Sequence, residues 1–575
     1  MLKISKYLKK YWWQILLVIL FVSVQTYVDL TLPEFMSKIV DNGIVNSDTD
    51  YIIKVGLQML GLALFGVFAT IIVGYFSARI SSGTARTLRK EVFEKVSNFS
   101  SEEINKFSPA SLITRTTNDI QQVQMAVFMI FRMMISAPLI GIGGVSKVIK
   151  NSPSLTWVIA VAVAALFVVI IILFSLAMPK FKIFQKLVDK LNLVTRENLT
   201  GLKVIRAFNN EEYQEEKFDK ANKDLTKINL FVNKVMITLQ PLTMLIMNLT
   251  MVAVIWFGSH FVDAGTLQIG DMMAFIQYSM QIMISFMMLS MLFVIIPRAS
   301  ISANRIIEVI NTETKINDPE NPKELNNKLR GQVEFKNVSF SYPDADEAVL
   351  NDISFIAEPG KTTAFIGSTG SGKSTLINLI PRFYDVTDGQ ILVSGVDIRD
   401  YTQEYLREHI GYVPQKGVLF SGTIKSNLKY GNENLTDEEM IEVARVAQAL
   451  DFIEEKEQKF DTHISQGGKN VSGGQKQRLS IARALAKKPD IFIFDDSFSA
   501  LDFKTDKVLR RELKKYTKNA TVLIVAQRIS TIMNADKIIV LDEGKIVGIG
   551  THKELVKNCE IYKEIALSQL KEEEL

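Results

Sequence analysis

A glycine-rich segment with a single lysine lies where an apolar, strand-like run passes into a helix-like run. Residues 362–366 precede it and residues 376–380 follow it. Glycines let successive backbone amides turn towards phosphate oxygens, and the following helix adds the positive end of its dipole. A lysine at this offset reaches the β- and γ-phosphates of a nucleotide, and the next hydroxyl binds Mg²⁺. The segment therefore predicts a phosphate-binding P-loop made of Gly367, Ser368, Thr369, Gly370, Ser371, Gly372, Lys373, Ser374 and Thr375.

Other segments in the same half carry groups that suit nucleotide chemistry. Residues 491–494 are an apolar run ending at Asp495, about 120 residues beyond the P-loop, where a carboxylate can hold Mg²⁺ directly or through water. Tyr342 follows the strand-like run 333–340 and could stack on an adenine ring. A second amide-rich helix start consists of Ser472, Gly473, Gly474 and Gln475. A chain with one P-loop has no need of two phosphate cradles, so we expect the second to serve a nucleotide bound to another subunit.

The composition narrows the class of protein. A chain of 575 residues is long enough for several domains, and its formal net charge of +4 gives no indication of a nucleic-acid surface. Cys559 is the single cysteine, which excludes a disulfide within the chain. The hydrophobic fraction is 47%, and most of the long apolar runs fall in the first 300 or so residues. We therefore expect a membrane half followed by a soluble half.

Apolar stretches in the first half are long enough to cross a bilayer, which takes about 20 residues each. Six such spans are predicted, near residues 13–32, 55–75, 125–145, 155–178, 235–257 and 272–296. Basic residues at the N-terminus and after the second and fourth spans place the N-terminus in the cytoplasm. The segments 77–124 and 179–234 are polar and helix-like, so we expect them to extend the spans beyond the lipid and to turn near Ser108 and Thr200.

The fold class that follows is a membrane α-helical domain, with six transmembrane helices and long cytoplasmic extensions, and then an α/β P-loop nucleotide-binding domain. The α/β assignment depends on strands that alternate with helices beyond Gly331. The predicted boundaries are 1–310 for the transmembrane domain, 311–330 for a charged linker and 331–575 for the nucleotide-binding domain.

Polar and methionine residues within the spans bear on what the membrane half handles. Asp29 and Arg132 are costly in hydrocarbon, so we expect them to face a cavity or a partner. Methionine side chains can line surfaces that accept varied apolar shapes, although lipid-facing or core packing is the alternative. More than half of the 21 methionines fall in the fifth and sixth spans: Met236, Met244, Met247, Met251, Met272, Met273, Met280, Met283, Met287, Met288 and Met291.

Residues 471–484, with the second amide cluster at their start, resemble the signature sequence of ATP-binding cassette (ABC) proteins. With the six spans before it, the whole chain resembles a half-transporter of the ABC exporter type. The resemblance implies ATP and Mg²⁺ as ligands, Tyr342 as the adenine-stacking residue, Gln415 as a Q-loop residue near the metal, and Asp495 as the Walker B carboxylate. It implies that Gln415 joins Ser374 and Asp495 as a ligand of Mg²⁺, and that the turns near Ser108 and Thr200 are coupling helices. In this family two nucleotide domains enclose ATP between the P-loop of one and the signature of the other, and their closure turns the membrane cavity outward.

Two residues depart from the family pattern at the reacting phosphate. Asp496 stands where the family has the glutamate general base, and Gln527, in the switch loop 525–528, stands where it has histidine. Aspartate is one methylene shorter, so its carboxylate would sit about 1.5 Å back from the attacking water, and general-base catalysis depends on hydrogen-bond reach. Glutamine cannot become a cation, although its amide can still donate. With Gln415, these residues form the predicted catalytic set of a site that binds ATP and hydrolyses it slowly. Gln466 also departs from the family's usual glutamate in the cross-talk loop.

A transporter with two slow sites would stall, so the pattern resembles the degenerate half of bacterial heterodimeric multidrug exporters. The implied partners are a homologous half-transporter, whose hydrolytic site this chain's signature completes, the lipid bilayer, and a hydrophobic small-molecule substrate, with no nucleic acid. The implied location is the bacterial inner membrane, with the nucleotide domain in the cytoplasm. The alternatives are a lipid flippase, a peptide exporter, a homodimer in which Asp496 works with a shifted water, and an ATP-gated regulator or channel subunit.

Overall fold

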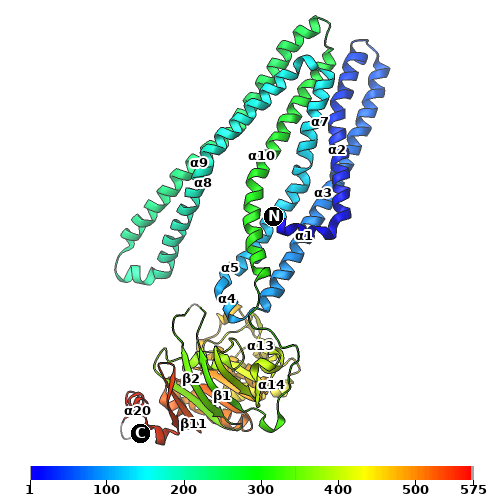
Figure 1. Cartoon of the computed structure of the whole chain (residues 1–575). Coiled ribbons are helices and arrows are strands. Elements are labelled where there is room, and N and C mark those ends of the chain that lie inside the picture. Colours follow the sequence, from blue (N-terminus) through cyan, green and yellow to red (C-terminus); the bar gives the residue numbers. More distant parts are fainter. Residues whose placement is uncertain (1, 344, 572–575) are drawn as a thin grey trace. The chain divides into compact units, whose positions relative to one another are not determined.

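The computed structural model describes residues 2–343 and 345–571. The chain forms two compact units, one comprising Met1–Ser97 and Pro109–Thr312 and the other comprising Asn98–Ser108 and Glu313–Leu575 (Figure 1). The predicted domains also include residues 1, 344 and 572–575, which lie outside the described residues. The short segment Asn98–Ser108 belongs to the second unit, although it lies within the apolar first half of the sequence.

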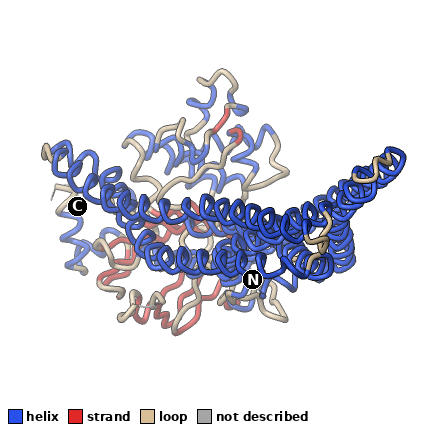
Figure 2. Tube along the Cα trace, turned by 90° about the horizontal axis from the view of Figure 1, so that it is seen from above, coloured by secondary structure: helices blue, strands red, loops and turns tan. Residues whose placement is uncertain are grey.

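The first unit is helical throughout (Figure 2). Among the described residues, six helices or helix runs are long and apolar enough to cross a membrane, as the sequence predicted. The α-helices of this unit are α1 Ser5–Leu8, α2 Trp12–Lys38, α3 Thr49–Ser97, α5 Pro109–Thr114, α6 Ile120–Met129, α7 Ser136–Asn151, α8 Thr156–Ala207, α9 Glu211–Asp263 and α10 Ile269–Asn311. Wider, π-type turns occur at Ile39–Ile44, Arg115–Asp119 and Ile130–Met134.

Apolar packing and a few polar bonds hold these helices together. α2 and α10 are joined by the Tyr278 hydroxyl, which donates to the Leu30 carbonyl at 3.1 Å, and by Gln281, which donates to the Asp29 carbonyl at 2.9 Å. Many other apolar side chains face outward, for example Ile71 with 63% of its surface exposed. Such exposure suits helices that satisfy their own backbone hydrogen bonds and present apolar side chains to lipid. Asp29 is half-buried and Arg132 is exposed in the chain.

The turn expected near Thr200 lies farther along the chain, so that prediction was wrong. α8 continues without a break through Gly201 to Ala207, and the chain reverses at residues 208–210 before α9. Asn209 takes the left-handed conformation, with φ of 49°, that commonly ends a helix. A glycine inside a helix only weakens it, whereas a left-handed residue stops it.

The second unit contains two larger sheets and a set of helices. In the described residues, one sheet has the strand order β2-β1-β4-β5, and the other has the order β12-β11-β3-β10-β9-β6. The strands are β1 Val333–Phe340, β2 Leu350–Ala357, β3 Thr362–Gly367, β4 Asp388–Val393, β5 Val396–Asp397, β6 Ile410–Val413, β9 Ile491–Asp495, β10 Thr521–Val525, β11 Lys537–Asp542 and β12 Lys545–Gly550, with a small pair β7 Gly422–Thr423 and β8 His463–Ile464. β11, β3, β10, β9 and β6 run parallel, and β12 is antiparallel at the edge.

Helices cover the parallel sheet and extend from it. They are α11 Lys373–Leu379, α12 Gln403–Glu408, α13 Ile424–Lys429, α14 Asp437–Val446, α15 Leu450–Glu454, α16 Gly473–Ala486, α17 Phe503–Tyr516, α18 Ile529–Ile532, α19 His552–Asn558 and α20 Glu560–Leu567. β9 and β10 are buried at every position, which explains their unbroken apolar runs. Because parallel strands end at one edge of a sheet, the loops after β3, β9 and β10 meet there. The predicted fold class is confirmed.

Candidate nucleotide-binding site

The predicted P-loop, residues 367–375, runs from the end of β3 into α11, so the expected strand and helix are both present. Its backbone favours glycine at three points: Gly367 has φ of 157°, Gly370 has φ of 89° and Gly372 has φ of 90°. A Cβ on Gly367 would lie 1.9 Å from the Leu541 carbonyl oxygen, and one on Gly372 would lie 2.7 Å from Leu350. The close packing of this loop against its neighbours therefore depends on the missing side chains.

Lys373 lies inside the curve of this loop. Its ammonium donates to the carbonyl oxygens of Gly367 (2.9 Å) and Ser368 (2.6 Å), and to the hydroxyl of Ser371 (3.1 Å). Burial lowers the pKa of Lys373, and the nearby carboxylates of Asp495 and Asp496 act in the opposite direction. The lysine is thus placed where phosphate oxygens can replace the loop's own oxygens as its partners.

Oxygen ligands suited to Mg²⁺ stand beside the lysine. The Ser374 hydroxyl donates to Asp495 Oδ1 at 2.9 Å, and Asp495 is buried, with 5% of its surface exposed. Burial raises the pKa of Asp495, as does the charge of Asp496, while the bond from Ser374 and the charge of Lys373 lower it. A hydroxyl and a carboxylate oxygen are ligands that Mg²⁺ accepts alongside phosphate oxygens, so these residues fit the metal. The Gln415 amide oxygen, the third predicted ligand, could join them.

Two loops that are far apart in sequence meet at one oxygen of Asp496. Its Oδ2 accepts hydrogen bonds from the amide of Gln527 at 2.8 Å and from the amide of Gln415 at 3.3 Å. Asp496 is buried and has φ of 44°, in the left-handed region. Burial raises its pKa, whereas bonds from Gln415 and Ser499 and the positive charge of Arg528 oppose that rise. The structure therefore brings the three residues of the predicted catalytic set into contact.

Tyr342 stands beside the P-loop. Its hydroxyl lies 2.9 Å from the Thr375 hydroxyl, and its ring meets the ring of Tyr384 edge to face, with 5.3 Å between centroids. Tyr384 in turn accepts a hydrogen bond at 3.2 Å from Asn105, in the short helix α4, Ser101–Phe107. The segment with a predicted turn near Ser108 is thus connected through two tyrosines to the P-loop. Sequence reasoning missed Tyr384, because one aromatic after a helix gives no signal of such a role.

The second glycine-rich cluster forms the start of α16. Ser472 and Gln475 make a capping box: the Ser472 hydroxyl accepts from the Gln475 amide at 3.2 Å, and the Gln475 side chain accepts from the Ser472 amide at 3.0 Å. A Cβ on Gly474 would lie 3.3 Å from the Ala500 carbonyl, whereas Gly473 has open space beside it. Gln466 is exposed in a short turn. The helix start is therefore already capped within its own chain, and it presents an open glycine.

Two further glutamines hold the loops that reach Asp496, and sequence reasoning missed both. Gln477, on α16, accepts from the Gly417 amide and donates to the Pro414 carbonyl, each at 3.1 Å. Gln569 makes the corresponding pair of bonds to the switch loop. Neither has a sequence signal, because a glutamine on a helix, like Gln477, or just after one, like Gln569, is ordinarily a surface residue.

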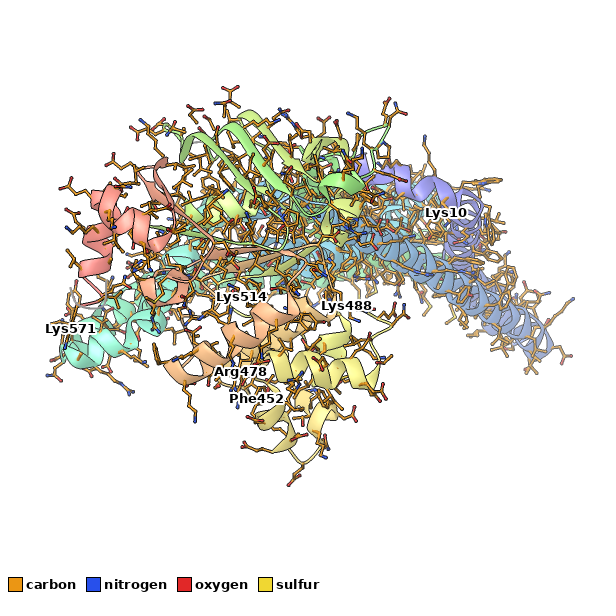
Figure 3. All side chains as sticks on the ribbon, turned by 90° about the horizontal axis from the view of Figure 1, so that it is seen from below. Lys10, Phe452, Arg478, Lys488, Lys514 and Lys571 are labelled. Atoms are coloured by element: carbon orange, nitrogen blue, oxygen red, sulfur yellow. The ribbon has the colours of Figure 1, made fainter. Side chains whose placement is uncertain are left out.

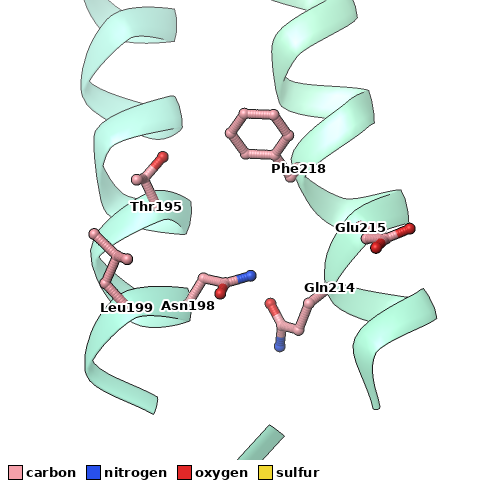
Figure 4. Close-up of a pocket in the computed structure, with 6 residues that line it drawn as sticks. All are labelled: Thr195, Asn198, Leu199, Gln214, Glu215 and Phe218. Atoms are coloured by element: carbon pink, nitrogen blue, oxygen red, sulfur yellow. The ribbon is translucent and has the colours of Figure 1, made fainter. Parts of the chain in front are cut away.

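Cavities also occur in the membrane unit. One of about 260 Å³ lies between α8 and α9 (Figure 4) and is lined by Thr195, Asn198, Leu199, Gln214, Glu215 and Phe218. Two apolar cavities of about 410 and 320 Å³ lie along α10; the larger is also lined by α7, and Met134 contributes to the smaller. Exposed methionines on α9 and α10 are Met244, Met251, Met273, Met280, Met287 and Met291.

Comparisons with known proteins agree with this arrangement. Residues 15–286 match the family "ABC transporter transmembrane region", and residues 350–499 match the family "ABC transporter". The chain is 42% identical over 549 residues to an ABC transporter ATP-binding protein of Mycobacterium tuberculosis, covering 95% of this chain and 94% of that protein. It is 29% identical to an ATP-dependent lipid A-core flippase of Chromobacterium violaceum, over 98% of this chain and 96% of the flippase. Among solved structures, a bacterial Atm1-family ABC exporter with ATP bound has a TM-score of 0.78 and 26% identity, covering 97% of this chain and 98% of the exporter chain.

Proposed function

Because the chain belongs to the ABC transporters and has the fold of an exporter half-transporter, we propose that it is the subunit of an ATP-driven exporter whose own site binds ATP but hydrolyses it slowly. The observation that carries this proposal is the geometry at Asp496. A general base must accept a proton from the attacking water. Here the carboxylate is one methylene shorter than that of glutamate, and one of its two oxygens, Oδ2, already accepts two amide donors, Gln527 and Gln415.

The other parts of the site are those that binding requires. Lys373 and the P-loop amides would hold the phosphates, and Ser374 and Asp495 would hold Mg²⁺, which supplies charge to offset that of the phosphates. Tyr342, with its ring beside the P-loop, would stack on adenine. The Gln527 amide, which now donates to Asp496, can donate to a phosphate oxygen instead, but it cannot supply a positive charge. ATP would therefore stay bound for long periods at this site.

A homologous half-transporter with a glutamate base is the proposed partner. The signature start at Ser472 has its capping box in place and open space beside Gly473, so it can contribute amides to the partner's nucleotide. Hydrolysis would then occur at the partner's P-loop, completed by this signature. A homodimer in which Asp496 uses a shifted water is the alternative.

The substrate proposed for the membrane half is a hydrophobic or amphipathic small molecule, exported across the bacterial inner membrane from a cytoplasm that contains the nucleotide domain. The apolar cavities along α10 and the exposed methionines support an adaptable apolar surface. A lipid substrate is the second candidate, and it is favoured by the similarity to a lipid A-core flippase. Export of peptides and a channel-like regulatory role have less support, because no feature of the cavities described above favours either.

The test is ATP hydrolysis by three purified samples. They are this chain alone, this chain with its co-encoded partner, and that pair with the partner's Walker B glutamate changed to glutamine. We expect turnover only in the second sample, near the ten per second or so that is typical of enzymes. Equal turnover by this chain alone, as a dimer, would exclude the slow-site proposal. Drug-stimulated and lipid-stimulated hydrolysis by the active pair would then separate the two substrate classes.

A further inference from the structure

The switch loop is held at its backbone by a side chain from the C-terminal segment. Gln569 follows α20, two residues before Lys571, which is labelled in Figure 3. Its Oε1 accepts a hydrogen bond from the Ile529 amide at 2.8 Å, and its Nε2 donates to the Gln527 carbonyl at 2.9 Å. One amide group thus binds the backbone on both sides of Arg528, as a neighbouring peptide group would in a sheet.

This loop has little regular structure of its own to hold it. β10 ends at Val525 and α18 begins at Ile529. Within the described residues, the side chain at the N-cap position, Arg528, makes no capping hydrogen bond. The first amides of a helix lack partners inside the helix, so the Ile529 amide needs an acceptor from elsewhere. Gln569, from a distant part of the chain, provides this acceptor and so caps the start of α18.

The segment that carries Gln569 is anchored in the domain core. On α20, Tyr562 and Ala566 are fully buried, and the Tyr562 hydroxyl lies 2.8 Å from His552 Nδ1. The Gln569 amide donates to the Ala566 carbonyl at 3.0 Å, and Leu570 packs against the same core. The Gln569 side chain therefore extends from an immobile backbone segment. Its two hydrogen bonds fix the switch loop relative to the domain core.

The same arrangement occurs on the other loop that reaches Asp496. Gln477 binds the backbone on both sides of the Gln415–Lys416 pair, and Gln569 binds it on both sides of Arg528. Gln415 and Gln527 both donate to Oδ2 of Asp496. Each of the two amide donors at this oxygen therefore lies on a loop whose backbone is held by a second glutamine.

We propose that Gln569 is a positioning residue for the ATP site. It fixes the switch-loop backbone so that the Gln527 amide is held ready beside Asp496 and, when ATP is bound, beside its terminal phosphate. This proposal rests on the proposed role of Gln527 at that phosphate. Unlike Gln477, which is 2% exposed, Gln569 is exposed, so water competes for its bonds and the hold can open. A loosened switch loop should lose affinity for ATP more than for ADP, because only ATP has the phosphate that Gln527 meets.

The experiment compares the affinities of the full-length chain for fluorescent ATP and ADP analogues, with Mg²⁺ present. Gln569→Ala removes both bonds, and Gln569→Asn keeps the amide but shortens its reach by one methylene. We expect both variants to reduce the preference for ATP over ADP about three- to tenfold, the size expected for exposed hydrogen bonds. The control is Ser568→Ala, because the Ser568 hydroxyl bonds to the Ile565 carbonyl of its own helix and should leave the preference unchanged.

Gln527→Ala, alone and combined with Gln569→Ala, completes the design. If Gln569 acts through Gln527, the Gln569→Ala effect disappears when Gln527 is already alanine. If Gln527→Ala reduces the preference and Gln569→Ala does not, the positioning role is overturned while the role of Gln527 stands. If Gln527→Ala has no effect, the role of Gln527 fails and the positioning role fails with it. An equal loss of ATP and ADP affinity in the Gln569 variants, additive with Gln527→Ala, would show a merely structural contact and overturn the proposal.

Discussion

Replacing Asp496 by asparagine separates a working general base from a carboxylate that only binds. Asparagine has nearly the same volume and, like aspartate, tolerates the left-handed backbone found here, with φ of 44°. Its amide oxygen can accept the Gln527 bond that the carboxylate accepts at 2.8 Å. We therefore expect the change to alter stability by less than about 1 kcal/mol and to remove only the ability to take a proton.

The expected magnitude follows from the contacts at Oδ2. General-base catalysis contributes about 10² to 10⁴ in rate, so a working base would show that loss on substitution. Because the side chain is one methylene short of the usual base and two amides engage one of its two oxygens, we expect Asp496→Asn to change turnover at this site by no more than about twofold. Asp496→Glu extends the carboxylate by about 1.5 Å and should raise turnover at least about tenfold, even though a longer side chain costs about 1 kcal/mol in the left-handed region.

The assay is phosphate release by this chain with its co-encoded partner, after the partner's Walker B glutamate has been changed to glutamine. In that background the residual rate reports the site of Asp496. Thermal unfolding of each variant controls for loss of fold. A hundredfold drop for Asp496→Asn, with unchanged unfolding temperature, would refute the reasoning and show that this aspartate is the base.

Further predictions concern the neighbours of this site. Tyr384→Phe keeps the ring but loses the oxygen that accepts from Asn105 at 3.2 Å, so amide exchange in α4 should become about three- to tenfold faster; unchanged exchange would contradict this. Gln477→Ala leaves two half-buried backbone groups without this partner, so the full chain should lose about 1 to 2 kcal/mol of stability, seen as a lower unfolding temperature. Burial raises the pKa of Asp495, so its charged form is complete only above that raised pKa and is lost as pH falls through it. Mg²⁺-dependent ATP binding should therefore weaken on acidification at a pH above the usual aspartate range of about 3.9, and Asp495→Asn should remove that part of the pH dependence. Acidification through the same window favours the folded state, because the buried carboxyl takes up its proton more readily than in the unfolded chain.

Much of the fold could be predicted from local patterns. The segment 367–375 predicts a P-loop because its glycines, lysine and hydroxyls stand at fixed offsets, and the structure has the expected strand before it and helix after it. The six spans could be predicted because each is a long apolar run whose backbone bonds are internal. The end of α8 could not, since the stop is made by the conformation of Asn209 and not by the glycine at 201.

The sequence by itself determined which chemical groups this protein has: a glycine- and serine-rich segment with Lys373, an aspartate at 496 and a glutamine at 527. Only the tertiary structure decided that Gln415 and Gln527, 81 and 31 residues away from Asp496, both donate to one of its oxygens. The physical reason is the order of the parallel strands, which brings the ends of β6, β9 and β10 to one edge of the sheet. Buried parallel strands are similar apolar runs, so their sequences do not say which of them will be neighbours.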